Sequence, residues 1–148
     1  MITKILVPVD GSEHANKAIE MATDLANHYN AVIHLLHVVT ATKIPDTISE
    51  LIRVEGIHES AYLAALKTIG NQILKTAYDK AKRRGAEHVQ TSVLEGDPAE
   101  MIIRFAKEGR FDMIVIGSHG LGNFQGLMLG SVSGKVCHTA NQTCVTVR

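Results

Sequence analysis

The sequence has little of several features that mark specialised classes of protein. It contains only two cysteines, Cys137 and Cys144, which are too few for a disulfide framework and too isolated for a zinc site. We expect both to be small packed residues of a protein in the reducing cytoplasm. Acidic and basic residues balance at 15 each, so no net charge favours nucleic acid as a partner. No segment approaches the roughly 18 consecutive apolar residues that a membrane span requires.

What is present is the composition of one globular domain. Apolar residues make up 45% of the chain and charged residues 20%, which does not favour disorder. A length of 148 residues is usual for a single domain and sufficient to bury a core. Residues 1–7 have the pattern of a strand and lack the apolar stretch and cleavage site of a secretory signal. We find no repeat or internal boundary, and expect one domain over residues 1–148.

Apolar segments of strand length alternate with amphipathic segments along the chain. The expected strands are residues 2–9, 31–39, 89–94, 113–116 and 143–147. The expected helices are residues 15–29, 62–81, 98–108 and 131–140, and residues 40–57 are expected to be a variable connection with room for a short helix. This alternation predicts an α/β fold with a parallel sheet and right-handed crossovers.

Polar residues mark where two of these helices begin. Either Asp10 or Ser12 can cap the first helix, and Asp97 followed by Pro98 is a strong start signal for the third. His34 and His37 alternate across the second strand, so they face opposite sides of the sheet and cannot chelate one metal ion.

A glycine-rich segment, residues 117–133, directly follows the fourth apolar strand. Four glycines fall within ten residues, which would weaken a helix or a strand there. Glycine lets backbone N–H groups approach an anion closely, and concave arrays of such groups bind phosphate. Gly130 and Ser131 then begin a helix, whose N-terminus is a second anion site, and Ser131 and Ser133 add hydroxyl donors. The segment therefore indicates phosphate binding, and the alternative is a flexible turn followed by an ordinary helix cap.

Three well-known motifs do not fit this segment. A P-loop needs a glycine where Leu129 stands and a hydroxyl where Val136 follows Lys135. The dinucleotide fingerprint needs a third glycine where Gln125 stands, and it follows the first strand of a sheet instead of the fourth. A nucleophile elbow needs a glycine at the position of Ile116.

The spacing that does fit is Gly-x2-Gly-x9-Gly-Ser, at Gly117, Gly120, Gly130 and Ser131. This pattern resembles the ATP-binding branch of the universal stress protein family. The resemblance covers the whole chain, and its other matching segments are residues 5–12, 36–38, 96–99 and 129–133. It implies an open, Rossmann-like five-stranded parallel sheet in the order 3-2-1-4-5, as in the adenine nucleotide alpha-hydrolases, with helices on both faces. In that order the first and fourth strands are neighbours at a switch point, beyond which ligands bind.

The resemblance also implies a nucleotide site that holds ATP with a divalent ion such as Mg or Mn. It places the backbone of Val38 against the adenine and makes Pro8 and Val9 walls of the base site. Asp10 would lie near the ribose and phosphates and could reach the metal ion through water, which is compatible with capping a helix. The residues that the resemblance places at or beside the phosphates are Gly117, Ser118, His119, Gly120, Gly130, Ser131, Val132 and Ser133.

The spacer between the two glycine groups departs from many members of the family. Where they carry a basic residue, this chain has Leu121, Asn123 and Gln125. We therefore expect backbone N–H groups and hydroxyls to hold the phosphates, helped by a divalent ion, with modest affinity. Lys135 could reach a terminal phosphate or be a solvated helix residue.

These features together favour a nucleotide-dependent regulator of the stress response. By resemblance it would be a homodimer that pairs through Val145 and Val147 of the last strand, and ATP would govern its choice of a regulatory protein partner. No carboxylate follows the glycine segment as a base and no arginine is positioned to stabilise developing charge. His119 is the one candidate, so a slow ATPase or an ATP-dependent enzyme is an alternative. A nucleotide-free interaction module of the same fold is another.

Overall fold

The structure is a computed structural model that describes residues 1–40, 49, 59–121 and 129–148. Its strands and helices are β1 (Lys4–Pro8), α1 (Glu13–Tyr29), β2 (Val32–Val39), α3 (Glu59–Arg83), β3 (Val89–Glu95), α4 (Pro98–Glu108), β4 (Met113–Gly117), α5 (Ser131–Thr139) and β5 (Thr143–Val147). The strands form one parallel sheet in the order β3-β2-β1-β4-β5, which confirms the predicted fold class and strand order. Most of the connection predicted for residues 40–57, with its short helix, lies outside the described residues.

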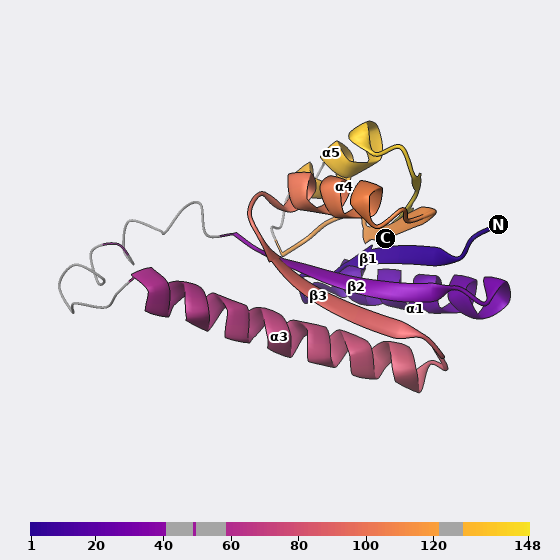
Figure 1. Cartoon of the computed structure of the whole chain (residues 1–148), viewed down its shortest axis with the longest axis horizontal. Coiled ribbons are helices and arrows are strands. Elements are labelled where there is room, and N and C mark those ends of the chain that lie inside the picture. Colours follow the sequence, from indigo (N-terminus) through magenta and orange to yellow (C-terminus); the bar gives the residue numbers. More distant parts are fainter. Residues whose placement is uncertain (41–48, 50–58, 122–128) are drawn as a thin grey trace.

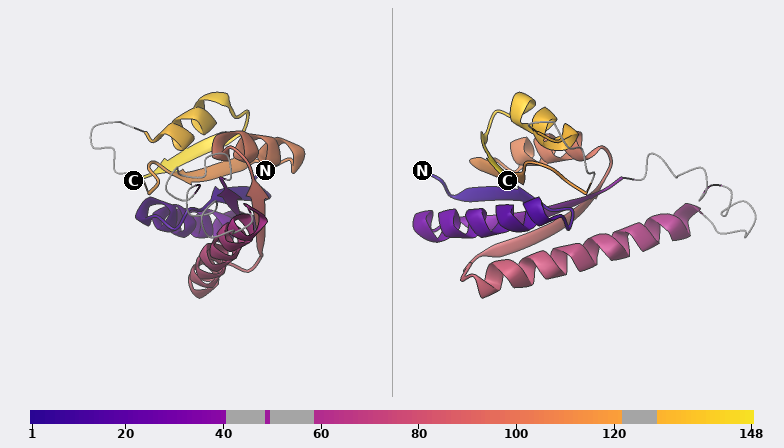
Figure 2. Two further views of the ribbon diagram at one scale, coloured as in Figure 1. Left: turned by 90° about the vertical axis from the view of Figure 1, so that its left-hand side faces the viewer. Right: turned by 180° about the vertical axis from the view of Figure 1, so that it is seen from behind.

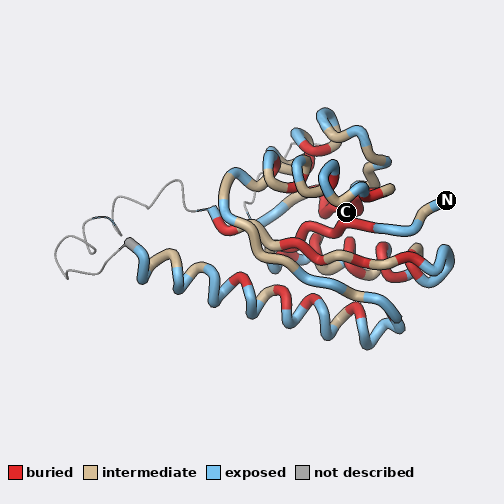
Figure 3. The backbone as a smooth tube through the Cα atoms, in the orientation of Figure 1, coloured by how far each residue is buried: buried red, intermediate tan, exposed pale blue. Residues whose placement is uncertain are grey.

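The sheet is covered by helices on both faces. Helices α1 and α3 pack against one face, and α4 and α5 pack against the other (Figures 1 and 2). Along β1, Ile5 and Val7 belong to the core on the first face, whereas Leu6 belongs to the core on the second. All three are fully buried, as the two-sided apolar pattern predicted, and Figure 3 shows buried residues concentrated in the central strands. Within the described chain, no helix is both long and apolar enough to cross a bilayer.

The central strand β1 positions the functional edge of the sheet. It pairs with β2 on one side and with β4 on the other. The chain leaves β1 through α1 toward β2, whereas it reaches β4 through α4, so the crossovers diverge at this point. Helices α1 and α4 begin shortly after β1 and β3 end, and the start of α5 also lies at this carboxyl edge. The carboxyl ends of β1, β2 and β4 therefore lie together at a switch point, where open α/β sheets bind ligands.

The helix caps settle one alternative that the sequence left open. Ser12 is the N-cap of α1, because its Oγ accepts a hydrogen bond from the backbone N–H of Ala15 at 3.2 Å. Asp10 does not cap the helix; its Oδ1 accepts from the N–H of Ser12 at 2.9 Å and so fixes the turn before it. Asp97 caps α4 as predicted, by accepting from the N–H of Glu100 at 3.0 Å.

The two histidines of β2 face opposite sides of the sheet, as expected. The ring of His34 packs edge-on against Phe105 and Phe111, with centroid distances of 5.0 and 5.7 Å. Its Nε2 lies 2.9 Å from Ser92 Oγ. Burial is the main cause that lowers the pKa of His34 from its ordinary value of 6.5.

This environment predicts an acid-dependent loss of stability that depends on His34. Because its folded-state pKa is lowered, the unfolded chain takes up the proton more readily, and the free energy of unfolding falls as the pH drops below about 6.5. We expect urea unfolding of the native protein to lose more free energy between about pH 7.5 and about pH 5.5 than unfolding of His34→Gln does. An equal loss in both proteins would assign the acid sensitivity to other groups.

Candidate functional site

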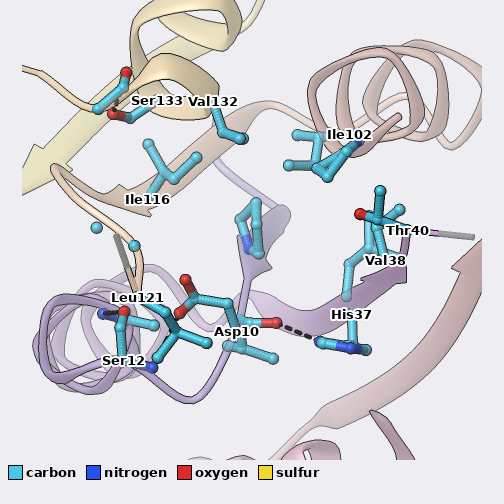
Figure 4. A pocket seen from close by; sticks show the side chains of 18 of the residues that line it. Asp10, Ser12, His37, Val38, Thr40, Ile102, Ile116, Leu121, Val132 and Ser133 are labelled. Carbon is cyan, nitrogen blue, oxygen red and sulfur yellow. Dashed lines mark hydrogen bonds between the residues drawn. The ribbon is translucent and has the colours of Figure 1, made fainter. Parts of the chain in front are cut away.

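A cleft of about 750 Å³ opens at the carboxyl edge of the sheet (Figure 4). Its walls come from the ends of β1, β2 and β4, from the starts of α1, α4 and α5, and from one side of α3. The site residues expected from the sequence that line it are Pro8, Val9, Asp10, Val38, Gly117, His119, Gly120, Gly130, Ser131, Val132 and Ser133. The remaining one, Ser118, is fully buried behind the cleft.

Three helix N-termini converge on this cleft. Ser12, Pro98 and Ser131 lie at the starts of α1, α4 and α5, and all three line the cleft. The N-terminal turn of a helix carries a partial positive charge and N–H groups without intrahelical acceptors. In α5 the N-cap is Gly130, which has no side chain to accept from these groups. Ser12 and Asp97 accept from N–H groups at the starts of α1 and α4, so the start of α5 is the one of the three that suits an anionic ligand without needing a basic side chain from the spacer.

The glycines of the motif meet different neighbours. A Cβ added to Gly117 would lie 2.7 Å from the backbone carbonyl carbon of His14 and 2.9 Å from the N atom of Ala15. Gly117 thus allows the end of β4 to pack directly on the first turn of α1. A Cβ on Gly120 would lie 2.6 Å from Asp10 Oδ2, inside the cleft. The first glycine serves packing between elements, whereas the second keeps open the space beside a carboxylate.

A hydrogen-bond network holds the start of α5 against the end of β4. The carbonyl oxygen of Ser118 accepts from the N–H of Gly130 and from the hydroxyl of Ser133, both at 2.7 Å. The N–H of Ser118 donates to the carbonyl oxygen of Val147 in β5, also at 2.7 Å. Ser133 is buried, so its hydroxyl fixes the loop, whereas the exposed Ser131 keeps a hydroxyl at the surface of the cleft.

Two histidines lie together at the glycine-rich end. The ring of His119 lies 5.4 Å from the ring of His14 in the first turn of α1, and its Nδ1 lies 3.2 Å from Ser118 Oγ. Sequence reasoning missed His14, since no spacing connects residue 14 with residue 119. Lys135 does not line the cleft; its Nζ lies 3.4 Å from Glu100 Oε1 and 3.5 Å from Asp97 Oδ1 of α4.

The opposite end of the cleft is organised by His37. Its Nδ1 lies 2.8 Å from the carbonyl oxygen of Val9, and because that oxygen can only accept, Nδ1 carries the hydrogen. The ring lies against α3 at Gly70, where an added Cβ would come within 2.6 Å of His37 Cδ2. His37 therefore joins the ends of β1 and β2 to α3. Its role was not predicted from the sequence.

Apolar side chains from distant helices complete this end. Those that the sequence analysis did not assign to the site are Leu66, Ile69 and Ile73 of α3 and Ile102 of α4. Helical spacing predicts only that such residues lie on the buried face of a helix. Whether that face borders a ligand cleft depends on tertiary packing, which the spacing does not report. In Figure 4, Ile102 lies near Val38 at this end of the cleft, so apolar side chains from α4 and β2 line it together.

Ionisable groups at the cleft are few. Of the described residues that line it, Asp10 alone is a carboxylate and none is lysine or arginine. In the part of the chain that the structure describes, no three His, Cys, Asp or Glu side chains are grouped as metal ligands. A metal ion at Asp10 would therefore need further oxygen ligands from water or from a bound molecule.

Comparison with known proteins gives a consistent result. A sequence profile of the universal stress protein family matches residues 1–148. The universal stress protein YxiE of Bacillus subtilis is 33% identical over 149 residues, covering 100% of both chains. The structure of UspA from Lactobacillus plantarum superposes with a TM-score of 0.83 at 24% identity, covering 99% of this chain and 97% of that one.

A further structure in this comparison contains a nucleotide. It is a universal stress protein family protein from Arabidopsis thaliana with AMP bound, and it superposes with a TM-score of 0.68 at 22% identity. The alignment covers 98% of this chain and 90% of that one. With the profile match over every residue and the sheet order that the resemblance implied, this chain belongs to the universal stress protein family.

Proposed function

We propose that this protein is an ATP-binding regulator of the stress response that holds the nucleotide in the cleft at the carboxyl edge of the sheet. The observation that carries the proposal is a cleft with the uncapped N-terminus of α5 at its glycine-rich end and apolar side chains at its other end. An adenine nucleotide has the matching polarity, since it joins an anionic phosphate chain to a flat base. A family member with AMP bound supports the same ligand class.

The two ends of the cleft suit the two ends of the ligand. The base would lie against Pro8, Val9 and Val38, which are held in place by the contact between His37 and the Val9 carbonyl. The phosphates would lie between Gly120 and Ser131, where helix N-termini supply N–H donors. The residues proposed for the base and those proposed for the phosphates line the same cleft, so one extended ligand can contact both groups.

Asp10 supports the participation of a divalent ion. Its Oδ2 is directed toward Gly120, into the region proposed for the phosphates. Two anionic groups this close repel each other unless a cation lies between them. We propose Mg or Mn in this position, bound to phosphate oxygens and to water that Asp10 holds.

The composition of the cleft favours holding ATP over cleaving it. Catalysis of phosphoryl transfer depends on groups that orient the nucleophile and on cations that neutralise developing charge. The described lining offers Asp10 and His119 for the first task and no lysine or arginine for the second. We therefore propose that any hydrolysis is slow.

We also propose that the protein is a cytoplasmic homodimer formed through β5. This strand pairs with β4 at one edge of the sheet, and Val145 and Val147 are partly buried along it. Pairing with a second copy would satisfy the backbone groups of an edge strand, which are otherwise open to aggregation. Bound ATP would then alter a surface that a regulatory protein partner contacts.

Ligand identity is tested by release and by stabilisation. Purified protein is denatured and the released nucleotide identified, and thermal unfolding is then measured with ATP and magnesium. At a ligand concentration of about 100 times Kd, stabilisation is about 2.7 kcal/mol, so we expect the melting temperature to rise by several degrees. ATP with EDTA should give a smaller rise, because no cation then shields Asp10.

Two outcomes would contradict the proposal in different ways. No change of melting temperature with ATP, ADP or AMP would favour the nucleotide-free interaction module. Release of phosphate in a single turnover, well above that from heat-denatured protein, would favour the ATP-dependent enzyme.

A further inference from the structure

The backbone of β2 turns its polar groups alternately toward its two neighbouring strands. The carbonyl oxygen of Leu36 accepts from the N–H of Val9 at 2.8 Å, on the side of β1. The carbonyl oxygen of Val39 accepts from the N–H of Gly96 at 3.0 Å, on the side of β3. Because successive residues of a strand face opposite neighbours, the N–H and the carbonyl of Val38 face the side of β1, beyond the last residue that pairs there.

The side chain of His37 takes the acceptor that the Val38 N–H would otherwise use. If β1 and β2 paired for one more rung, this N–H would donate to the carbonyl oxygen of Val9. The ladder ends before that rung, at Pro8 and Leu36, and the Val9 carbonyl accepts from His37 Nδ1 at 2.8 Å (Figure 4). Within the described residues, no backbone hydrogen bond between these strand ends lies beyond the one from Val9 to Leu36.

Helix α3 holds the imidazole in this position. A Cβ added to Gly70 would lie 2.6 Å from His37 Cδ2 and 3.2 Å from His37 Nε2, so glycine there leaves room for the ring. The ring is thus held between α3 and the ends of β1 and β2, with Nδ1 on the Val9 carbonyl. Val38, the next residue of β2, lines the cleft.

We propose that His37 is a positioning residue that makes the cleft selective for adenine, because it leaves the backbone of Val38 open to the edge of the base. This inference rests on the proposed function, since it concerns the same site. Adenine presents an acceptor, N1, beside a donor, the N6 amino group, and these match the N–H and the carbonyl of one residue. Guanine presents a donor, N1–H, beside the acceptor O6, so each of its groups would face a like group of Val38.

Removing the imidazole should alter the site of the base without altering the site of the phosphates. In His37→Leu the Val9 carbonyl loses its donor, and the Val38 N–H is the group that can replace it. Adenine then loses one hydrogen bond, whereas guanine had none to lose at this position. The residues proposed for the phosphates, Gly120 and Ser131, lie outside β1 and β2 and keep their contacts.

The inference is tested by measuring Kd for ATP and for GTP, each with magnesium, by titration calorimetry. The native protein should bind ATP more tightly than GTP by about tenfold or more. In His37→Leu the affinity for ATP should fall by about fivefold, the effect of one neutral hydrogen bond, and the affinity for GTP should not fall. His37→Asn is the matched control, because the amide nitrogen of asparagine can occupy the place of imidazole Nδ1, so it should keep the affinity of the native protein for ATP.

A purely structural role of His37 would give a different pattern. An equal loss of affinity for ATP and GTP in His37→Leu would overturn the inference. So would a loss in His37→Asn as large as that in His37→Leu. Equal affinity of the native protein for ATP and GTP would overturn this inference alone and leave nucleotide binding intact, whereas a native protein that binds no nucleotide would overturn the proposed function as well.

Hydrogen exchange of the Val38 amide, followed by NMR in the nucleotide-free protein, tests the same geometry without a ligand. We expect fast exchange in the native protein and in His37→Asn. Exchange should be slower in His37→Leu, where the amide can donate to the Val9 carbonyl. Strong protection of the Val38 amide in the native protein without nucleotide would overturn the inference even if ATP binds.

Discussion

Replacing Gly117 with alanine is expected to destabilise the fold by about 2–3 kcal/mol, at the upper end of what overpacking usually costs. The added Cβ would lie 2.7 and 2.9 Å from backbone atoms of His14 and Ala15. Backbone in the first turn of a capped helix cannot yield as a flexible side chain can. Either β4 or α1 must therefore move, and both belong to the layers that enclose the core. Urea unfolding should show a lower midpoint with an unchanged slope.

A matched control lies in the same region of the sequence. Gly134 is also a glycine near the cleft, but a Cβ there would meet only Leu129 Cβ, at 3.9 Å. Since alanine is favoured over glycine inside a helix by about 1 kcal/mol, Gly134→Ala should be neutral or stabilising. If Gly117→Ala were as stable as Gly134→Ala, β4 and α1 would not pack closely enough at Gly117 to exclude a Cβ atom.

Gly120→Val is expected to remove nucleotide binding while leaving the fold intact. Its Cβ would lie 2.6 Å from Asp10 Oδ2, and the methyl groups would fill the space proposed for the phosphates. Here the neighbour is the end of a side chain, which can rotate away, and Gly120 is exposed. The melting temperature without ligand should stay within a few degrees of the native value, because surface substitutions usually cost about 0.5 kcal/mol or less.

The measurement is thermal unfolding with and without ATP and magnesium. The native protein should be stabilised by several degrees, and Gly120→Val should not respond. Gly134→Ala serves again as the control and should respond as the native protein does. Equal stabilisation of native protein and Gly120→Val would place the nucleotide elsewhere. Together with Gly117→Ala, this result would separate a glycine needed for packing from a glycine needed for the ligand.

The strands and helices of the fold were predictable because each is marked by residues close together in the sequence. The central strands β1 and β4 are apolar on both faces, and the helix starts carry Asp97 with Pro98 and Ser12 with its first turn. The strand order came from the family resemblance, since alternation alone permits several orders. The choice between Asp10 and Ser12 as the cap could not be made from the sequence, because both side chains can accept a hydrogen bond and only the backbone path decides between them.

The site was predicted in part, and the missing residues share a physical reason. The glycine-rich segment and residues 8–10 could be assigned because their spacing reflects the path of the backbone. The contact of His37 with Gly70 joins residues far apart in the sequence, and no periodicity reports it. The internal role of Ser133 was also hidden, since a serine near a helix start has the same sequence pattern whether it faces a ligand or a carbonyl.

The convergence of helix N-termini has a consequence for how this site can vary. The positive ends of peptide dipoles are not encoded by any single side chain, so no charge-reversing substitution can delete them. What a substitution can do is misalign them, by shifting a helix start relative to the sheet. The anion site should therefore tolerate substitutions that keep the path of the backbone and not those that change it. Which substitutions are accepted there would depend on backbone conformation more than on side-chain charge.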